Sequence, residues 1–335
     1  MKRIAILLLL LVLQGVAVAQ SCRVVAFYNV ENLMDTLNDP TKRDDDMLPA
    51  ADREWTSERY ERKLQSLASV VGAMSAENGF PALLGLAEVE NRAVVEDFVA
   101  QEAVTAANYK VLHYDSPDPR GIDVALLYRP DCFEVEDSYP LRAEVGLPTR
   151  DYLVVRGRLC GEPVLVVVVH LPSRIGGEEF TSARRVAAAR QLRAIIDDLR
   201  NEEPARQIIL MGDMNDTPRD ESIRRVLNAK LHPRKAQGND LYNPYASVKG
   251  SMVYRDRWYC YDQIILSADF LRGGALQLKG RGYAFSRRDM LDSRRHPRAT
   301  YRGVEYLGGV SDHLPIALVV EKKNALKIAR KRKNS

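Results

Sequence analysis

The chain has 335 residues, of which 46% are hydrophobic and 28% charged, with a formal net charge of +4 at pH 7. This length excludes a minimal module and suffices for one large domain, or two small ones, with a sizeable core. A leader that carries Lys2 and Arg3 would account for two of the positive charges, and the remaining +2 is too weak a bias to indicate a nucleic-acid partner by itself.

The N-terminal residues have the pattern of a secretory leader. Lys2 and Arg3 precede an almost entirely apolar run over residues 4–13, and residues 15–19 end in an A-x-A-like sequence, which predicts a signal peptide over residues 1–19. The run is short for a membrane anchor, so we expect a periplasmic or extracellular protein without stable membrane insertion after cleavage. Cys22 leaves a lipoprotein as the alternative, although the residues before it lack the large apolar side chain expected there.

Export would permit disulfide bonds, and the chain has an even number of cysteines whose spacing is not that of a metal site: Cys22, Cys132, Cys160 and Cys260. Cys132 and Cys160 flank adjacent predicted strands and are the pair that we favour. Buried free thiols are the alternative.

The first half of the mature chain alternates predicted strands and helices. The acidic stretch Asp44–Asp46 could hold a metal, but a solvated loop is the preferred interpretation. Thr56 is the expected N-cap of a helix. In order, we expect a strand at 23–29, a helix at 56–74, a strand at 81–87, a helix at 93–106, and strands at 109–114 and 122–128.

In the second half, two long strands flank Gly161, and the helix that follows is rich in arginine, which predicts a solvated basic face. Residues 231–256 are polar and remain unassigned. The expected elements here are a strand at 164–169, a helix at 181–200, a strand at 207–211, a strand at 258–267 and a final strand at 317–320.

The strands have the composition of a layered α/β fold. Their continuous apolar runs are typical of sheets buried on both faces, and many strands with few, dispersed helices predict stacked sheets with helices outside. Because no repeat and no Pro/Gly/Ser-rich linker divides the chain, we expect one domain over residues 22–321, a flexible basic tail over 322–335, and a monomer.

Chemically capable side chains stand where five of the strands end: Asn29 and Glu31; Glu88; His170; Asp213 and Asn215; Asp312 and His313. Asp262 lies inside a sixth, apolar strand, where a carboxylate must be paired or ligated, and a histidine is its natural partner. Carboxylate and amide oxygens suit a hard divalent cation, and a histidine or carboxylate can activate water. The pattern therefore predicts metal-assisted hydrolysis of a phosphate ester.

The motifs resemble, in their chain order, those of the endonuclease/exonuclease/phosphatase superfamily, which includes DNase I-like nucleases, abasic endonucleases, sphingomyelinases and inositol-polyphosphate phosphatases. The matching segments are 27–32, 86–89, 121–128, 170–174, 212–215, 261–264 and 311–313, which extend over almost the whole mature chain. The resemblance implies a four-layer α/β sandwich in which two mixed β-sheets pack face to face with helices outside.

The resemblance also implies a role for each residue. Glu88 would be the principal Mg²⁺ ligand, with Asn29, Glu31 and Asp312 as the other members of the metal site; Mn²⁺ and Ca²⁺ are alternative ions. The catalytic group would comprise Asp213 and Asn215, which orient the attacking water, the His313–Asp262 dyad, and the second histidine, His170. Asn29 and Asn215 would contact the phosphate together with Arg174, for which a solvated position is the alternative.

The expected function is that of an exported, Mg²⁺-dependent phosphodiesterase or nuclease, with nucleic acid as the favoured substrate. One alternative is a phospholipid or inositol-phosphate hydrolase, because the same fold hosts several phosphate substrates. A lipid enzyme needs an exposed apolar loop, for which Phe180 and residues 242–254 are the candidates. A non-catalytic binding scaffold is the other alternative, and the presence of every expected site residue argues against it.

Overall fold

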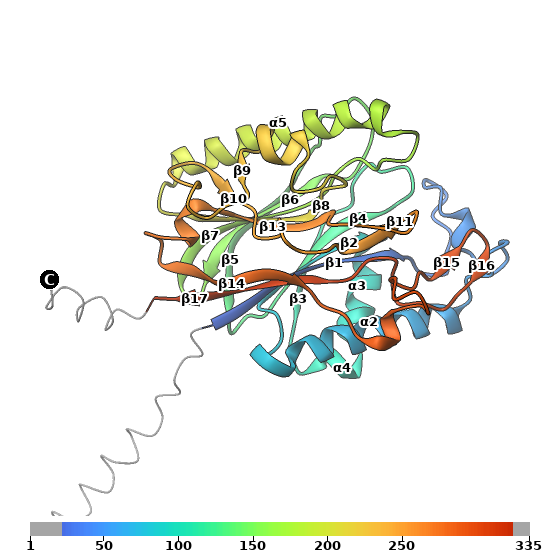
Figure 1. Cartoon of the computed structure of the whole chain (residues 1–335). Helices are drawn as coiled ribbons and strands as arrows, with labels where there is room; N and C mark the ends of the chain where they lie inside the picture. Colours follow the sequence, from blue (N-terminus) through green and yellow to red (C-terminus); the bar gives the residue numbers. More distant parts are fainter. Residues whose placement is uncertain (1–21, 324–335) are drawn as a thin grey trace, which may run out of the picture.

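The computed structural model describes residues 22–323, arranged around two β-sheets (Figure 1). The expected leader at 1–19, and the part of the expected tail beyond residue 323, lie outside the described residues. No helix within residues 22–323 combines the length and apolar character that crossing a membrane requires.

The first sheet has six strands in the order β14-β17-β1-β2-β4-β3. Its members are β1 (Cys22–Leu33), β2 (Leu83–Val89), β3 (Lys110–His113), β4 (Asp123–Tyr128), β14 (Leu276–Ala284) and β17 (Ile316–Lys322). It is mixed, because β1 runs parallel to β2 whereas β17 and β4 pair antiparallel with their neighbours.

The second sheet has seven strands in the order β5-β6-β7-β8-β13-β10-β9. Its members are β5 (Phe133–Leu141), β6 (Tyr152–Leu159), β7 (Glu162–His170), β8 (Gln207–Asp213), β9 (Ala229–Lys230), β10 (Leu241–Tyr242) and β13 (Asp262–Ser267). The pairs β7–β8 and β9–β10 are parallel, and β8–β13 is antiparallel.

Helices cover the outer faces of both sheets (Figure 1). On the first sheet these are α2 (Ser57–Asn78), α3 (Arg92–Val99) and α4 (Glu102–Thr105), and on the second sheet the covering helix is α5 (Glu178–Glu202). The smaller elements are η1 (Asp45–Met47), η2 (Ser222–Val226), η3 (Ala268–Phe270), η4 (Arg288–Met290) and two hairpins, β11 (Met252–Tyr254) with β12 (Arg257–Tyr259), and β15 (Tyr301–Arg302) with β16 (Glu305–Tyr306).

Strand alternation divides the core into layers. In β1, Val25 and Phe27 pack into the cluster between the two sheets, whereas Val24, Ala26 and Tyr28 pack against the helices of the first sheet. A third cluster fills the space between the second sheet and α5. These layers confirm the expected sandwich of two mixed sheets with helices outside.

Several expected elements have different bounds. The helix expected at 93–106 breaks at Ala100 and Gln101 into α3 and α4, and the strand expected at 258–267 divides into β12 and β13, which lie in different sheets. Strands β5 and β14 were not expected. They are edge strands with several exposed polar residues, so they lack the apolar run of a buried strand.

Two expectations about polar and sulfur-containing side chains were wrong, and a third holds in part. Cys132 and Cys160, the favoured disulfide pair, are free thiols that pack as small apolar groups against the core between the sheets. Arg185, expected on a solvated face, is fully buried, with its Nε 2.7 Å from an Asp216 oxygen. In the acidic stretch, Asp45 and Asp46 are exposed as expected, whereas Asp44 is only 3% exposed.

Candidate active site

The ends of strands from both sheets meet at one edge of the sandwich. In the second sheet, Asp213 lies in register with His170 of β7 on one side and Asp262 of β13 on the other. In the first sheet, Asn29 of β1 pairs with Ala87, next to Glu88 of β2. The segment before β17 brings Asp312 and His313 to the same edge.

The backbone is strained at three residues of the site. Glu31, Glu88 and Asn215 all have left-handed backbone conformations, with φ of 53°, 64° and 49°. The register of β1 with β2 shifts after Asn29, and that of β2 with β4 shifts after Ala87. Such bulges and positive φ values at non-glycine residues cluster at functional sites, where they re-aim side chains.

The Asn29 side chain connects the two sheets. Its amide nitrogen donates to an oxygen of Glu88 at 3.2 Å and to an oxygen of Asp213 at 3.1 Å, and its amide oxygen accepts the N–H of Glu31 at 3.0 Å. The second Glu88 oxygen accepts the N–H of Asn32 at 3.1 Å. One buried amide therefore fixes a carboxylate from each sheet.

Asp213 is the centre of this group. One oxygen accepts the N–H of Asn215 at 2.9 Å, and the other lies 3.6 Å from Nε2 of His170 and 4.0 Å from Nε2 of His313. Burial, and then the negative charge of Asp262, raise the pKa of Asp213 to about 6. A carboxylate with this pKa is a stronger base than an exposed aspartate and is still ionised at neutral pH.

His313 and Asp262 form the expected dyad. Nδ1 of His313 lies 2.6 Å from an Asp262 oxygen, and Asp262 is fully buried. Burial opposes protonation of His313, but the negative charges of Asp262, Asp312 and Asp213 raise its pKa well above the usual value. His313 is therefore an imidazolium at neutral pH, with its Nε2 on the side of Asp213.

His170 has the opposite charge state. Burial, followed by the positive charges of Arg150, Arg120 and His313, lowers its pKa well below the usual value, so the ring is neutral. Its Nδ1 is buried without a hydrogen-bond partner. The site thus combines one neutral and one cationic imidazole, a distinction that the sequence does not show.

Glu31 and Asp312 lie together beside Glu88. One Glu31 oxygen accepts the N–H groups of Thr300 and Asp312, at 2.7 and 3.0 Å, and lies 3.9 Å from Nζ of the buried Lys63. Burial and the charge of Glu31 raise the pKa of Asp312 to about 7. Because protein groups already bind this Glu31 oxygen, Glu31 is better placed to support the metal site than to be its principal ligand.

This donor set fits a hard divalent cation. Glu88, Asp213 and Asp312 present carboxylate oxygens, and Asn29 and Glu31 lie within the same group. Burial and neighbouring carboxylates raise the pKa values of Asp213 and Asp312, and carboxylates outnumber the cationic Lys63 and His313 in this group. Oxygen ligands and excess negative charge are what Mg²⁺ and related ions require.

Two basic residues of the site were missed. Lys63 of α2 donates to the Thr300 hydroxyl and the Val310 carbonyl, both at 2.7 Å. The sequence could have indicated that Lys63 is buried, because Lys63 lies on the same helical stripe as the apolar Leu67. Arg150 donates to the carbonyl of Leu171 at 2.8 Å, and nothing in its local sequence marks it.

Arg174, expected to bind phosphate, has other partners. Its guanidinium lies 2.7 Å from carboxylate oxygens of both Asp216 and Asp220 and 2.9 Å from one of Glu178, and its Nε donates to the Asn215 carbonyl at 2.8 Å. These contacts fix Arg174 beside the turn that carries Asn215, and its contact with phosphate stays a prediction.

Comparisons with known proteins agree with this arrangement. A family model described as "Endonuclease/Exonuclease/phosphatase family" matches residues 24–322. A search among curated proteins found no match.

Similar solved structures include an endonuclease/exonuclease/phosphatase family protein from Bacteroides thetaiotaomicron, with 17% identity, a TM-score of 0.57 and coverage of 90% of this chain and 98% of that chain. D. rerio TDP2 complexed with a single-strand DNA product has 17% identity, a TM-score of 0.56 and coverage of 90% and 100%. The mannosyl-6-phosphatase Bt3783 of Bacteroides thetaiotaomicron VPI-5482 has 17% identity, a TM-score of 0.56 and coverage of 89% and 99%. At these identities the likeness shows the shared fold.

Proposed function

The chain belongs to the endonuclease/exonuclease/phosphatase family, and from that premise we propose that it is an exported, Mg²⁺-dependent phosphodiesterase that acts on nucleic acid. The observation that carries the chemistry is the Asn29 amide, which joins Glu88 of one sheet to Asp213 of the other, beside two buried histidines. The fold and the family are those of a phosphoesterase.

In this proposal Glu88 and Asp312, supported by Asn29 and Glu31, hold the cation. When bound, the cation neutralises negative charge on the phosphoryl oxygens. Asp213, with its raised pKa, accepts a proton from the attacking water, while the P–O bond to the leaving alcohol breaks and the leaving oxygen takes up a proton from solvent. The His313 imidazolium, held by Asp262, donates from Nε2 to a phosphoryl oxygen. Asn215 fixes the orientation of the Asp213 carboxylate through its N–H.

The nucleic-acid preference is supported by the β11–β12 hairpin. A β-bridge between Met252 and His313 ties the hairpin to the dyad. The hairpin exposes Tyr254, at 54%, and the charged side chains of Arg255 and Arg257. Positive charge for phosphates and an accessible aromatic ring for a base are the features that single-stranded nucleic acid requires.

The lipid alternative has its own observation. Ile175, just before α5, and Phe180, in its first turn, are 84% and 78% exposed. Exposed apolar side chains in one segment suit contact with a membrane surface. This alternative makes phospholipid the second substrate class to be tested.

A hydrolysis screen of the mature protein with Mg²⁺ or Mn²⁺ tests the proposal. Its substrates are single- and double-stranded DNA, RNA, sphingomyelin, inositol phosphates, mannose 6-phosphate and an aryl phosphodiester. We expect turnover of a nucleic acid and its loss after exhaustive EDTA treatment. Turnover of sphingomyelin or a sugar phosphate, without cleavage of DNA or RNA, would show that nucleic acid is not the substrate.

Tyr254→Ala is expected to raise KM for single-stranded DNA about tenfold with little change in kcat, because stacking of a base on an aromatic ring is worth about 1–3 kcal/mol. Arg257→Ala should also raise KM and lessen its salt dependence, because one fewer phosphate contact releases fewer counterions. Steady-state kinetics at several salt concentrations provide the measurement. Arg190→Ala, which removes an exposed arginine of α5, is the matched control. If all three changes raise KM equally, the hairpin has no specific role in binding DNA.

The pH profile of kcat/KM is expected to rise with pH through about 6, because Asp213 is protonated below its raised pKa and then cannot accept a proton. Since the pKa of Asp312 is raised to about 7, protons should also compete with the cation in this range. Raising the Mg²⁺ concentration should therefore move the acid limb to lower pH. Initial rates between pH 5 and 8 at two Mg²⁺ concentrations measure both effects, and a flat profile would rule out Asp213 as the base.

A further inference from the structure

A second group of ionisable side chains lies on the other face of the first sheet. His113 of β3 is two residues from Val111 and in register with Ala125 of β4, and both of these apolar residues pack toward the helices. By strand alternation, His113 and Asp123 face that helix-covered side. The alternation of β1 that places Phe27 between the sheets places Asn29 there as well. The second group is therefore separate from the candidate active site.

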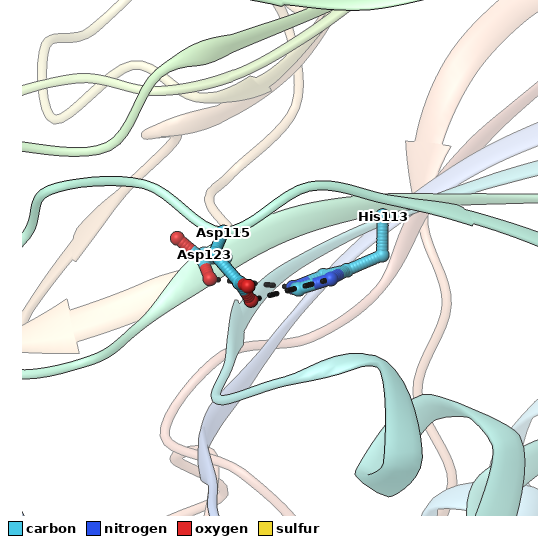
Figure 2. A group of neighbouring side chains, drawn as sticks. All are labelled: His113, Asp115 and Asp123. Atoms are coloured by element: carbon cyan, nitrogen blue, oxygen red, sulfur yellow. Dashed lines mark ion pairs between the residues drawn. The ribbon is translucent and has the colours of Figure 1, made fainter. Parts of the chain in front are cut away.

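The geometry of this group is that of convergent ligands. Figure 2 shows the carboxylates of Asp115 and Asp123 meeting at the ring of His113. Nε2 of His113 lies 3.3 Å from an Asp123 oxygen, and Nδ1 lies 3.9 Å from an Asp115 oxygen. One ligand atom from each residue can be chosen so that all three lie within 4.8 Å of one another. Atoms that share an ion at bond lengths of about 2.0–2.4 Å have this spacing.

The histidine lacks the partner that its burial demands. His113 is 8% exposed, yet its Nε2, although near Asp123, makes no hydrogen bond. Buried polar atoms are nearly always hydrogen-bonded, so an unbonded ring nitrogen that faces a carboxylate points to a missing ligand. This observation is independent of the acidic character of the neighbouring residues.

The Asp123 carboxylate is already oriented for such a ligand. Its Oδ1 accepts the backbone N–H of Ser116 at 3.0 Å and also the Ser116 hydroxyl, while Oδ2 faces His113. Hydrogen bonds that fix one oxygen of a carboxylate and leave the other toward an ion are typical of the groups that surround metal ligands.

The group opens to solvent through an acidic pocket. Asp115 and Asp123 line a pocket of about 380 Å³ together with Asp35, Asp39 and Glu90. Lys42 is the basic residue in its wall, and its Nζ donates to the backbone carbonyls of Ser116 and Asp118 at 2.9 and 3.3 Å. The negative potential of the pocket therefore attracts a cation from solvent, and its volume leaves room for water ligands.

We propose that His113, Asp115 and Asp123 form a second metal site, for a divalent transition metal of the zinc or manganese class. One imidazole nitrogen with two carboxylate oxygens favours these ions over Mg²⁺ and Ca²⁺, which prefer oxygen ligands alone. The metal ties the end of β3 to the start of β4 and closes the loop between them. The site contributes to the stability of this loop and is not part of the hydrolytic centre.

Counting bound zinc in the wild type and three variants tests the proposal. After equilibrium dialysis against Zn²⁺, elemental analysis should find about two ions per wild-type chain, about one in Glu88→Gln, about one in Asp115→Asn and close to none in the double variant. The Asp115 side chain is 83% exposed, so Asp115→Asn is compatible with folding. An Asp115→Asn chain that keeps the wild-type zinc count and affinity would overturn the proposal.

Asp39→Asn is the matched control, because it removes the same charge from the same pocket but not from the proposed ligand set. Asp115→Asn and His113→Gln should each weaken zinc binding in the Glu88→Gln background by about tenfold or more, and Asp39→Asn by less than about threefold. Calorimetric titration with Zn²⁺ measures these ratios. Equal weakening by Asp115→Asn and Asp39→Asn would mean that zinc responds only to the general negative potential of the pocket, around a His113–Asp123 ion pair. This result would overturn the proposed metal site.

Discussion

His313→Ala is expected to lower kcat by about three orders of magnitude, because the change removes the cationic donor that faces Asp213 at the site edge. Asp262→Asn should cost less, about a hundredfold, since the histidine remains but loses the charge that keeps it protonated and oriented. The double variant should lose little more than His313→Ala alone, because the two side chains act as one unit.

A double-mutant cycle on kcat with the best substrate of the hydrolysis screen provides the measurement, with folding checked by circular dichroism. His296→Ala is the matched control, because this histidine lies beside the exposed Asp256 and outside the dyad. Additive losses at His313 and Asp262, or a folded His313→Ala chain with wild-type turnover, would show that the pair is not the catalytic dyad.

The sequence identifies the strand ends of the site for a physical reason. Apolar runs that stop at a polar residue, such as those ending at His170 and Asp213, mark strands that leave the core at a sheet edge. The buried charge of Asp262 in an apolar strand likewise requires a partner, and the structure places His313 there at 2.6 Å. These parts of the site follow from burial and alternation, which are local properties of the sequence.

Other parts depend on contacts between distant segments. Glu88 and Glu31 have left-handed backbone conformations, although neither is a glycine, the residue that would indicate such a conformation in a sequence. The surrounding structure imposes this conformation. The opposite charge states of His170 and His313 arise because burial and then the charge of Arg150 lower the pKa of His170, whereas the charge of Asp262 raises that of His313 against its burial. No pattern along the chain contains this information.

The corrections have a common origin as well. Arg185 was expected on a solvated face because arginine is usually exposed, and it instead contacts Asp216, as Arg174 does. A buried carboxylate can recruit basic residues from elsewhere in the chain, and the sequence gives no sign of which ones. Lys63 differs, because its place on the apolar stripe of α2 indicated burial, although nothing in the helix indicated that it would lie beside Glu31.

Glu88→Gln is expected to remove most of the activity at limiting Mg²⁺, by about three orders of magnitude, with little recovery at high Mg²⁺. Glutamine keeps the size of the side chain and an oxygen that can accept the Asn32 N–H, which Glu88 now binds at 3.1 Å. It loses the charge that a hard cation requires. Its amide would also place a donor, instead of a second acceptor, toward the Asn29 amide.

The measurement is kcat/KM as a function of Mg²⁺ concentration for Glu88→Gln and for a matched control, Glu90→Gln. The control removes a carboxylate from the same segment, but Glu90 accepts the backbone N–H of Asp35 and lies in the pocket on the other side of the sheet. It should keep activity within about threefold of wild type, because no residue of the hydrolytic centre contacts it. Wild-type activity that survives exhaustive EDTA treatment, or a Glu88→Gln chain as active as Glu90→Gln, would contradict the assignment of Glu88 as the principal ligand of a catalytic metal.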